Sequence, residues 1–444
     1  MASNAFVNMF KVKELRDRVF FTLLILAVFR LGCVLTVPGI NATLLLQYFD
    51  SFANSAESAF ASYMDFFAGG AFEKFSVFML GVMPYISTQI ILQLALVIFP
   101  SLKRMAQEEG GQQKVQMWTR VGTILVCLIQ GYAITVYADS INNAVPGTII
   151  FANRFYFKFL AILTVTTGSM ITVWLGDQIT ARGIGNGISM LIFAGIVARL
   201  PSALWELWNG VSSGTINPVF AIVAVLLFVV IIALVVYEQS GERKIPVHYA
   251  KRVVGRKMYG GQNTYIPFKI NPSGVIPIIF ASAFLTFPSL LANALSGKAT
   301  WIQKLANFLT YGGLWYNIIQ VLLIIFFAYF YTQVTLNPTE IAKNIRENGG
   351  SIPGIRTDKT EEYLQRVLNR LILPGSLYLA VIAVLPSIIQ AVFKFPQSVA
   401  ALMGGTSLLI LVGVDLDTMA QVEALLKMHH HDGFTKKGLK PRSL

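Results

Sequence analysis

Residues 218–237 read PVFAIVAVLLFVVIIALVVY, a run without one charged side chain. A helix needs about 20 consecutive apolar residues to cross the roughly 30 Å hydrocarbon core of a bilayer. The run has this length and therefore predicts a transmembrane helix. Similar runs lie on both sides of it along the chain, so this stretch indicates the fold class of the whole protein.

The composition agrees with many membrane crossings. Of the 444 residues, 55% are hydrophobic and only 13% are charged, whereas a soluble protein is about a quarter charged. We therefore expect an all-α polytopic membrane protein with ten spans. The predicted spans are 18–38, 75–99, 118–138, 155–175, 187–205, 218–237, 274–295, 314–336, 371–391 and 400–426.

The net charge of +13 is distributed unevenly. Lysine and arginine concentrate before the first span, between spans two and three, six and seven, and eight and nine, and after the tenth. By the positive-inside rule this pattern places both termini in the cytoplasm, which agrees with an even number of spans.

Two of these basic loops, 238–271 and 337–370, are longer than a connection between helices requires. The first is either a solvated loop or a docking surface for a large acidic partner, such as RNA or an acidic protein face. The second mixes acids and bases. We expect it to form a short helix, a turn at 349–354 and a second helix.

A short apolar segment, AFASYMDFFAGGA at 59–71, precedes the second span. It is too short to cross a bilayer, and Gly69 and Gly70 separate it from that span. It is either an amphipathic helix at the interface or a half-helix covered by protein.

Ten spans divide into two sets of five, and an odd number in each set inverts the second set in the membrane. We expect halves at 1–210 and 211–427, followed by a cytoplasmic tail at 428–444.

Residues that carry chemistry are scarce. The spans hold few ionisable groups (Arg30, Asp415, Asp417 and Glu423), and no chain of acids and histidines crosses the midplane. No phosphate-binding loop, hydrolytic array or metal-binding motif occurs. The histidine run 429–431 is expected to be a solvated tail. We expect no catalytic residue, metal or cofactor, and hence no enzyme.

Several motifs, in order along the chain, resemble those of the SecY family. Members of this family are the central subunit of the bacterial protein-conducting channel. They are PGIN (38–41), FAGGA (67–71), LGVMPYIS (80–87), WLGDQITARGIGNGISMLI (174–192), YAKR (249–252), GVIP (274–277), LNP (336–338), PGIR (353–356) and GGTSLLI (404–410).

The resemblance implies two five-helix, inverted-repeat halves around a central hourglass pore. An aliphatic ring in such a pore grips an extended chain without preferring any side chain, and it resists wetting. The implied ring residues are Val82, Ile86, Ile188, Ile192, Ile279 and Ile410. The implied plug, which closes the pore from outside, comprises Tyr63, Met64, Asp65, Phe66, Phe67, Ala68, Gly69, Gly70 and Ala71.

Spans two and seven correspond to a lateral gate. Polar groups that face each other across such a seam contribute about 1 kcal/mol or less each, so the apolar core of a signal sequence can replace them. The implied gate residues are Ser87, Thr88, Gln93, Ser282 and Phe287.

The resemblance also implies binding partners for the two basic loops. Arg243, Lys244, Arg252, Arg256 and Arg356 are the implied docking residues for the ribosome, through its RNA, or for the SecA motor. Other implied partners are SecE and SecG in a heterotrimer, precursor polypeptides with signal sequences, the lipid bilayer, and SecDF and YidC. The implied location is the bacterial plasma membrane.

The expected function is translocation of unfolded secretory polypeptides across the membrane, with lateral release of membrane segments, driven by SecA or the ribosome. One departure from the family pattern stands out, because Glu73 and Lys74 add charge directly after the plug glycines. An ion-coupled secondary transporter is the alternative, but it needs polar groups at the midplane, which the spans lack. A scaffold that only assembles other proteins is a third class.

Overall fold

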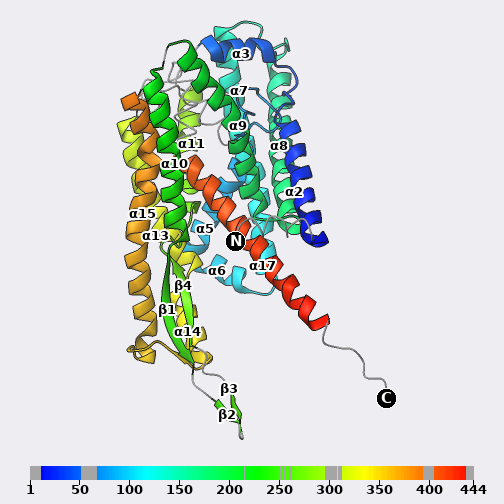
Figure 1. Ribbon diagram of the computed structural model, residues 1–444. Helices are drawn as coiled ribbons and strands as arrows, with labels where there is room; N and C mark the ends of the chain where they lie inside the picture. The colour runs from blue at the N-terminus through cyan, green and yellow to red at the C-terminus, as the bar shows by residue number, and fades with distance from the viewer. Residues whose placement is uncertain are drawn as a thin grey trace, which may run out of the picture.

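The computed structural model describes residues 12–51, 68–214, 216–249, 252–254, 257–259, 263–295, 308, 313–393 and 405–436. In these ranges the chain forms a bundle of long helices, with a small sheet projecting from one end (Figure 1). The last helix crosses the bundle obliquely and extends beyond it at the same end as the sheet.

Each of the ten predicted spans overlaps a long helix. These helices are α2 (Lys13–Gly32), α5 (Met83–Ile98), α7 (Gly111–Ala144), α8 (Arg154–Arg182), α9 (Gly187–Ser212), α10 (Pro218–Ser240), α11 (Ile276–Leu295), α13 (Leu314–Thr335), α15 (Thr360–Phe393) and α17 (Gly405–Lys436).

Six of the described helices are long and apolar enough to cross a membrane, namely α7, α8, α9, α10, α13 and α15. The number becomes seven if α5 and the short α6 (Pro100–Gln107), which meet at 105°, form one bent span. The prediction of a mostly helical protein with several membrane spans is confirmed at this level.

Asparagine side chains cap the N-termini of four of the helices. The carboxamide oxygens of Asn153, Asn186, Asn217 and Asn337 accept hydrogen bonds from main-chain N–H groups at the starts of α8, α9, α10 and α14 (Pro338–Glu347). The first N–H groups of a helix have no partner within it, so each cap satisfies donors that hydrocarbon cannot.

The region before α5 is irregular although it is as apolar as a span. The second predicted span began at residue 75, but the helix starts only at Met83. Phe75 (φ 48°) and Gly81 (φ 54°) adopt left-handed backbone conformations that interrupt a helix. The backbone instead pairs with the chain after α2, through Val37 N–H to Phe75 O at 2.9 Å and Val77 N–H to Leu35 O at 2.8 Å. These bonds allow non-helical chain to lie inside the bundle. The short α3 (Ala42–Ser51) follows residues 35–37 along the chain.

The loop between α10 and α11 is a β-hairpin rather than an unstructured loop. Strand β1 (Glu242–Tyr249) pairs antiparallel with β4 (Asn263–Lys269), in a register that sets Glu242 opposite Lys269. The hairpin tip carries β2 (Arg252–Val254) and β3 (Lys257–Tyr259).

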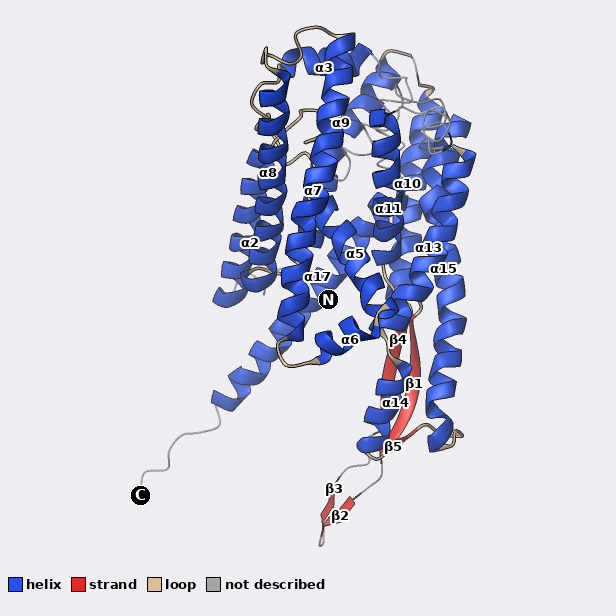
Figure 2. Cartoon of the chain, turned by 180° about the vertical axis from the view of Figure 1, so that it is seen from behind, coloured by secondary structure: helices blue, strands red, loops and turns tan. Residues whose placement is uncertain are grey.

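The second long loop joins the same sheet. Its two-residue strand β5 (Gly350–Ser351) pairs with β1, giving the order β4-β1-β5. The loop otherwise contains α14, the 3₁₀ helix η1 (Thr357–Lys359) and the start of α15, as predicted. Ile245 and Val247 of β1 pack with apolar residues of α14 and α15, so the two loops share one hydrophobic core. We call this body the loop domain (Figure 2).

Candidate pore, lateral gate and docking surface

The six predicted ring residues lie in one contiguous apolar cluster within the bundle. Val82 and Ile86 come from the start of α5, Ile279 from α11 and Ile410 from α17, and each is at most 8% exposed. Ile192 of α9 is 2% exposed, and Ile188 is half-buried against the same cluster. Four separate helices therefore bring these side chains into one apolar region.

The two helices of the predicted gate, α5 and α11, are in contact and lie side by side in Figure 2. Between them is a cavity of about 190 Å³, which α7 helps to enclose. Among the described residues that line it, Ser87 is the only polar one. The residues that line it are Ser87, Ile90, Ile91, Leu94, Val126, Ala283, Phe284 and Pro288.

Two of the predicted gate hydroxyl groups donate a hydrogen bond within their own helix. Thr88 Oγ1 donates to Pro84 O at 2.9 Å, and Ser282 Oγ donates to Ile279 O at 2.8 Å. Thr88 faces α7, because a Cβ atom on Gly122 would lie 2.6 Å from its methyl group. The Gln93 Oε1 atom is buried and has no hydrogen-bond partner among the described residues. Aliphatic side chains therefore make up most of the described lining at the α5–α11 seam.

Several cavity residues had no signal that singled them out in the sequence. Ile90, Ile91 and Leu94 fall on one helical face with Ser87, at the spacing i, i+3, i+4 and i+7. That spacing was visible, but it does not say whether the face meets lipid or a helix. Pro288 lies inside α11, where it removes a main-chain hydrogen bond and weakens the helix locally. The side chain of Phe287 lies outside the described part of the chain.

The described part of the predicted plug sits against α2 and α9. Ala68 and Ala71 are buried, while residues 63–67 lie outside the described residues. Gly69 (φ 66°) and Gly70 (φ 89°) have left-handed backbones, which favour glycine. A Cβ atom on Gly69 would come within 2.8 Å of the Gly195 Cα atom, so the two backbones touch. The segment is therefore fitted closely to α9.

Arg30, the predicted ionisable residue of the first span, has a partner in this segment. Its guanidinium donates a hydrogen bond to the Gly69 carbonyl. Close by, Cys33 Sγ lies 3.8 Å from the Ala68 carbonyl. A charged group inside the bundle is thus used to hold irregular backbone.

The predicted docking residues lie on the loop domain. Arg243 and Lys244 are exposed on β1, and the Lys244 ammonium lies 4.8 Å from the centre of the Tyr265 ring. Arg356 is exposed just before η1. Arg252 belongs to β2, although only its backbone is described, and Arg256 lies outside the described residues.

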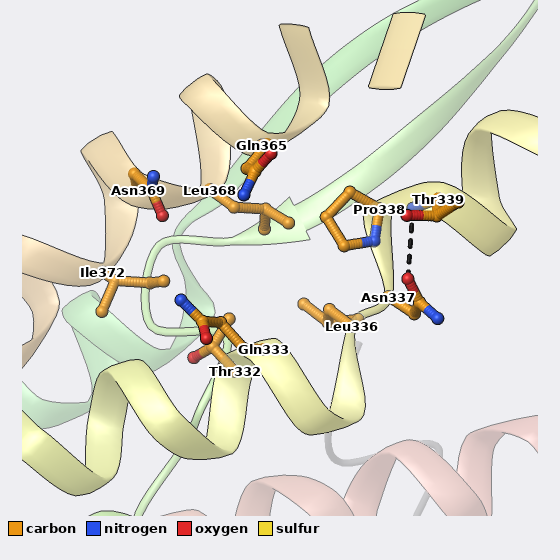
Figure 3. Close-up of a pocket in the computed structure, with 10 residues that line it drawn as sticks. All are labelled: Thr332, Gln333, Leu336, Asn337, Pro338, Thr339, Gln365, Leu368, Asn369 and Ile372. Atoms are coloured by element: carbon orange, nitrogen blue, oxygen red, sulfur yellow. Dashed lines mark hydrogen bonds between the residues drawn. The ribbon is translucent and has the colours of Figure 1, made fainter. Parts of the chain in front are cut away.

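A second cavity, of about 250 Å³, lies where α13 ends and α14 begins, beside α15 (Figure 3). The described residues of its lining include carboxamides but no charged side chain. Asn337 Oδ1 accepts from the Thr339 N–H at 3.2 Å, and Pro338 occupies the first turn of α14. The LNP motif therefore has a structural role in turning the chain. The lining residues are Thr332, Gln333, Leu336, Asn337, Pro338, Thr339, Gln365, Leu368, Asn369 and Ile372.

Comparison with known proteins identifies the family. The SecY family profile matches residues 76–419. The protein translocase subunit SecY of Borreliella burgdorferi is 43% identical over 434 residues, which are 97% of each chain. That of Thermotoga maritima is 44% identical over 439 residues, 98% of each chain.

The chain belongs to the SecY family. It is therefore a multi-pass membrane protein and a subunit of a protein translocation channel, and it is not an enzyme. The transporter alternative is not favoured.

Solved structures share the SecY fold with this chain. A protein-conducting channel aligns with a TM-score of 0.63 at 19% identity, covering 92% of each chain. Sec61 in a canine ribosome–channel complex from the endoplasmic reticulum aligns with a TM-score of 0.59 at 18% identity, again over 92% of each chain. A SecY structure whose plug domain is described as stabilising the closed channel aligns with a TM-score of 0.61 at 19% identity.

Proposed function

We propose that this channel subunit opens in two directions, across the membrane through a ring of aliphatic side chains and sideways into lipid between α5 and α11. Its ten long helices form two inverted five-helix halves, at 1–210 and 211–427, with a cytoplasmic tail at 428–444. The match of each predicted span to a helix supports this layout.

The observation that carries the proposal is the 190 Å³ cavity at the α5–α11 seam. Two helices separated by unfilled apolar space lose little contact when they part. The apolar core of a signal sequence fills such a space, because aliphatic surface there is removed from water without an unpaired polar group.

The ring works by the absence of specific contacts. Secretory polypeptides vary in sequence, so a conduit that bonded to particular side chains would stall on some of them. Val82, Ile86, Ile188, Ile192, Ile279 and Ile410 present only aliphatic groups, which slide past any side chain and exclude ions by resisting water. The plug at 63–71 closes this ring from outside in the resting state.

The loop domain is the docking surface for the driving partner. Arg243 and Arg356 are exposed and, within the described part of the chain, make no ion pair, so their charge is available to an acidic surface. Ribosomal RNA and the SecA motor are the partners of this chemistry. The subunit works with SecE and SecG in a bacterial plasma membrane, with both termini cytoplasmic, and passes clients to SecDF and YidC.

Reconstitution tests the proposal. Purified complex with SecE and SecG in lipid vesicles, supplied with SecA and ATP, should bring a secretory precursor into a protease-protected compartment. A cysteine-reactive probe in the precursor signal sequence should cross-link to Ser87→Cys in α5. Lack of ATP-driven protection would count against the channel role, and protection without cross-linking would count against the gate.

A further inference from the structure

The irregular segment 68–82 is held by charged groups at two points. Near its start, Arg30 of α2 donates to the Gly69 carbonyl. Further on, the Glu73 carboxylate pairs with the Arg199 guanidinium of α9, with 2.9 Å between Oε2 and Nη2. We call the Glu73–Arg199 pair the charge latch. The pair gives a partner to Glu73, whose charge departs from the family pattern.

The charge latch is partly shielded from solvent. The Arg199 side chain is 19% exposed and the Glu73 side chain 33%. Water and salt screen such a pair less than a fully exposed one, so its attraction is felt more strongly. Reversing one of the two charges therefore replaces an attraction with a repulsion that water screens incompletely.

The other contact between the segment and α9 is made by the backbones of two glycines. Gly69 and Gly195 touch through their backbones, and a Cβ atom on Gly195 would lie 3.1 Å from the Gly69 Cα atom. Neither residue has a side chain that interlocks with the other. This contact permits close approach but does little to prevent sliding, so the charge latch supplies a directional hold.

One face of α9 connects the charge latch with the ring. Ile192, Gly195 and Arg199 follow the spacing i, i+3 and i+7, which places them on the same side of a helix. The same face therefore carries a ring residue, the contact with the segment and the latch. The contacts with Gly69 and Glu73 therefore lie on the same face of α9 as the ring residue Ile192, while Val82, at the other end of the segment, belongs to the ring itself.

We propose that Glu73 and Arg199 are positioning residues that hold residues 68–73 against α9 beside the ring and set how strongly a signal sequence must engage before the channel opens. The proposal rests on the channel function proposed above. Opening displaces the segment and separates the pair. A precursor with a long apolar signal supplies that free energy, and one with a short apolar signal does not, so the latch makes the channel selective.

The test uses charge reversal in the reconstituted complex. Glu73→Arg and Arg199→Glu should each raise the resting halide flux of the vesicles about tenfold. Each should also raise the uptake of a precursor with a shortened apolar signal, while a precursor with its full signal changes little. The double variant Glu73→Arg/Arg199→Glu restores the pair with reversed polarity and should return both measurements toward the original values.

The matched control is Arg154→Glu. Arg154 pairs with Asp139 at 2.6 Å and so links the start of α8 to α7 rather than to the segment, and its reversal should leave the halide flux unchanged. If charge reversal lowers the amount of complex in the membrane, Glu73→Gln and Arg199→Gln replace it.

Unchanged flux and selectivity in single variants at normal abundance would overturn the latch, as would a double variant that behaves like the sum of the singles. Failure of the unmodified complex to take up any precursor would overturn the channel function instead.

Discussion

The α8–α9 interface and the α5–α11 seam solve the packing of two helices in opposite ways. At α8–α9, a Cβ atom on Gly187 would lie 1.9 Å from the Gly176 carbonyl oxygen, and Thr180 Oγ1 accepts from the Gly187 N–H at 2.9 Å. At α5–α11, aliphatic side chains border a 190 Å³ cavity beside Pro288. Small residues and cross-helix hydrogen bonds fix the first interface, whereas the second can separate at little cost.

Adding one methyl group to the fixed interface should have the largest effect. Gly187→Ala places a Cβ atom against backbone that has no free rotamer to yield, and we expect a loss of about 3 kcal/mol or more of stability. The amount of folded protein in membranes and its thermal unfolding in detergent measure this loss. Gly131→Ala is the control, because its Cβ atom would meet Ile162 at an ordinary 3.6 Å. Equal tolerance of both substitutions would remove the distinction between the interfaces.

Locking the seam should abolish uptake without unfolding the protein. In a chain whose buried cysteines Cys33 and Cys127 are replaced by alanine, Ser87→Cys and Ala283→Cys are joined by a flexible bismaleimide. Precursor uptake should fall to background, because α5 and α11 can no longer part. Cross-linking Gly131→Cys to Ile162→Cys, between α7 and α8, should leave uptake unchanged. Full uptake through a locked seam would show that the seam does not open.

Reversing a docking charge should slow uptake while both interfaces stay intact. For Arg356→Glu we expect a decrease of about tenfold in the uptake rate, since an attractive contact with an acidic partner becomes repulsive. Arg366→Glu is the control, because Arg366 already pairs with Glu362 at 2.9 Å on α15. Normal uptake by Arg356→Glu would move the docking surface elsewhere.

Filling the seam cavity should give the smallest effect. Ala283→Leu adds aliphatic volume where space exists, so the closed seam gains about 1 kcal/mol and opening slows about fivefold. The rate should fall most for a precursor with a weak signal sequence. Ala161→Leu in the close-packed α8, where Ala161 is 1% exposed, should instead lower the amount of folded protein. If Ala283→Leu also prevents folding, the cavity has no room for a larger side chain.

The spans were predictable because hydrocarbon allows few alternatives to a helix. The same rule explains the error at the start of α5. Residues 75–82 are apolar enough to span, but their backbone finds partners at Leu35 and Val37, which lie far away in sequence. The β-hairpin was missed for a related reason. Its buried face is marked by few residues, Ile245 and Val247 on β1 and Phe268 on β4, and the pairing of β1 with Gly350 and Ser351 is not local.

The residues at the contact between α5 and α11 could be predicted only in outline. Polar residues in span two drew attention to α5, yet consecutive residues point about 100° apart on a helix. Ser87 therefore lines the cavity while Thr88 turns to α7. Aliphatic residues such as Ile91 and Leu94 have the same appearance in the sequence whether they meet lipid, a helix or a cavity. Which of them forms the seam depends on the placement of α11, which no short window of sequence encodes.

The shared sheet has a mechanical consequence. Since β1 bonds to β4 on one side and to β5 on the other, a load applied to the hairpin is divided among α10, α11 and the α14–α15 pair. Strand β4 ends at Lys269 and α11 begins at Ile276, so only a short tether separates the sheet from one of the two seam helices. Close by, a Cβ atom on Gly375 of α15 would lie 3.2 Å from the Ile270 carbonyl oxygen. That contact places α15 against the link between the sheet and α11, so we expect a force on the hairpin to be transmitted through this link to α11.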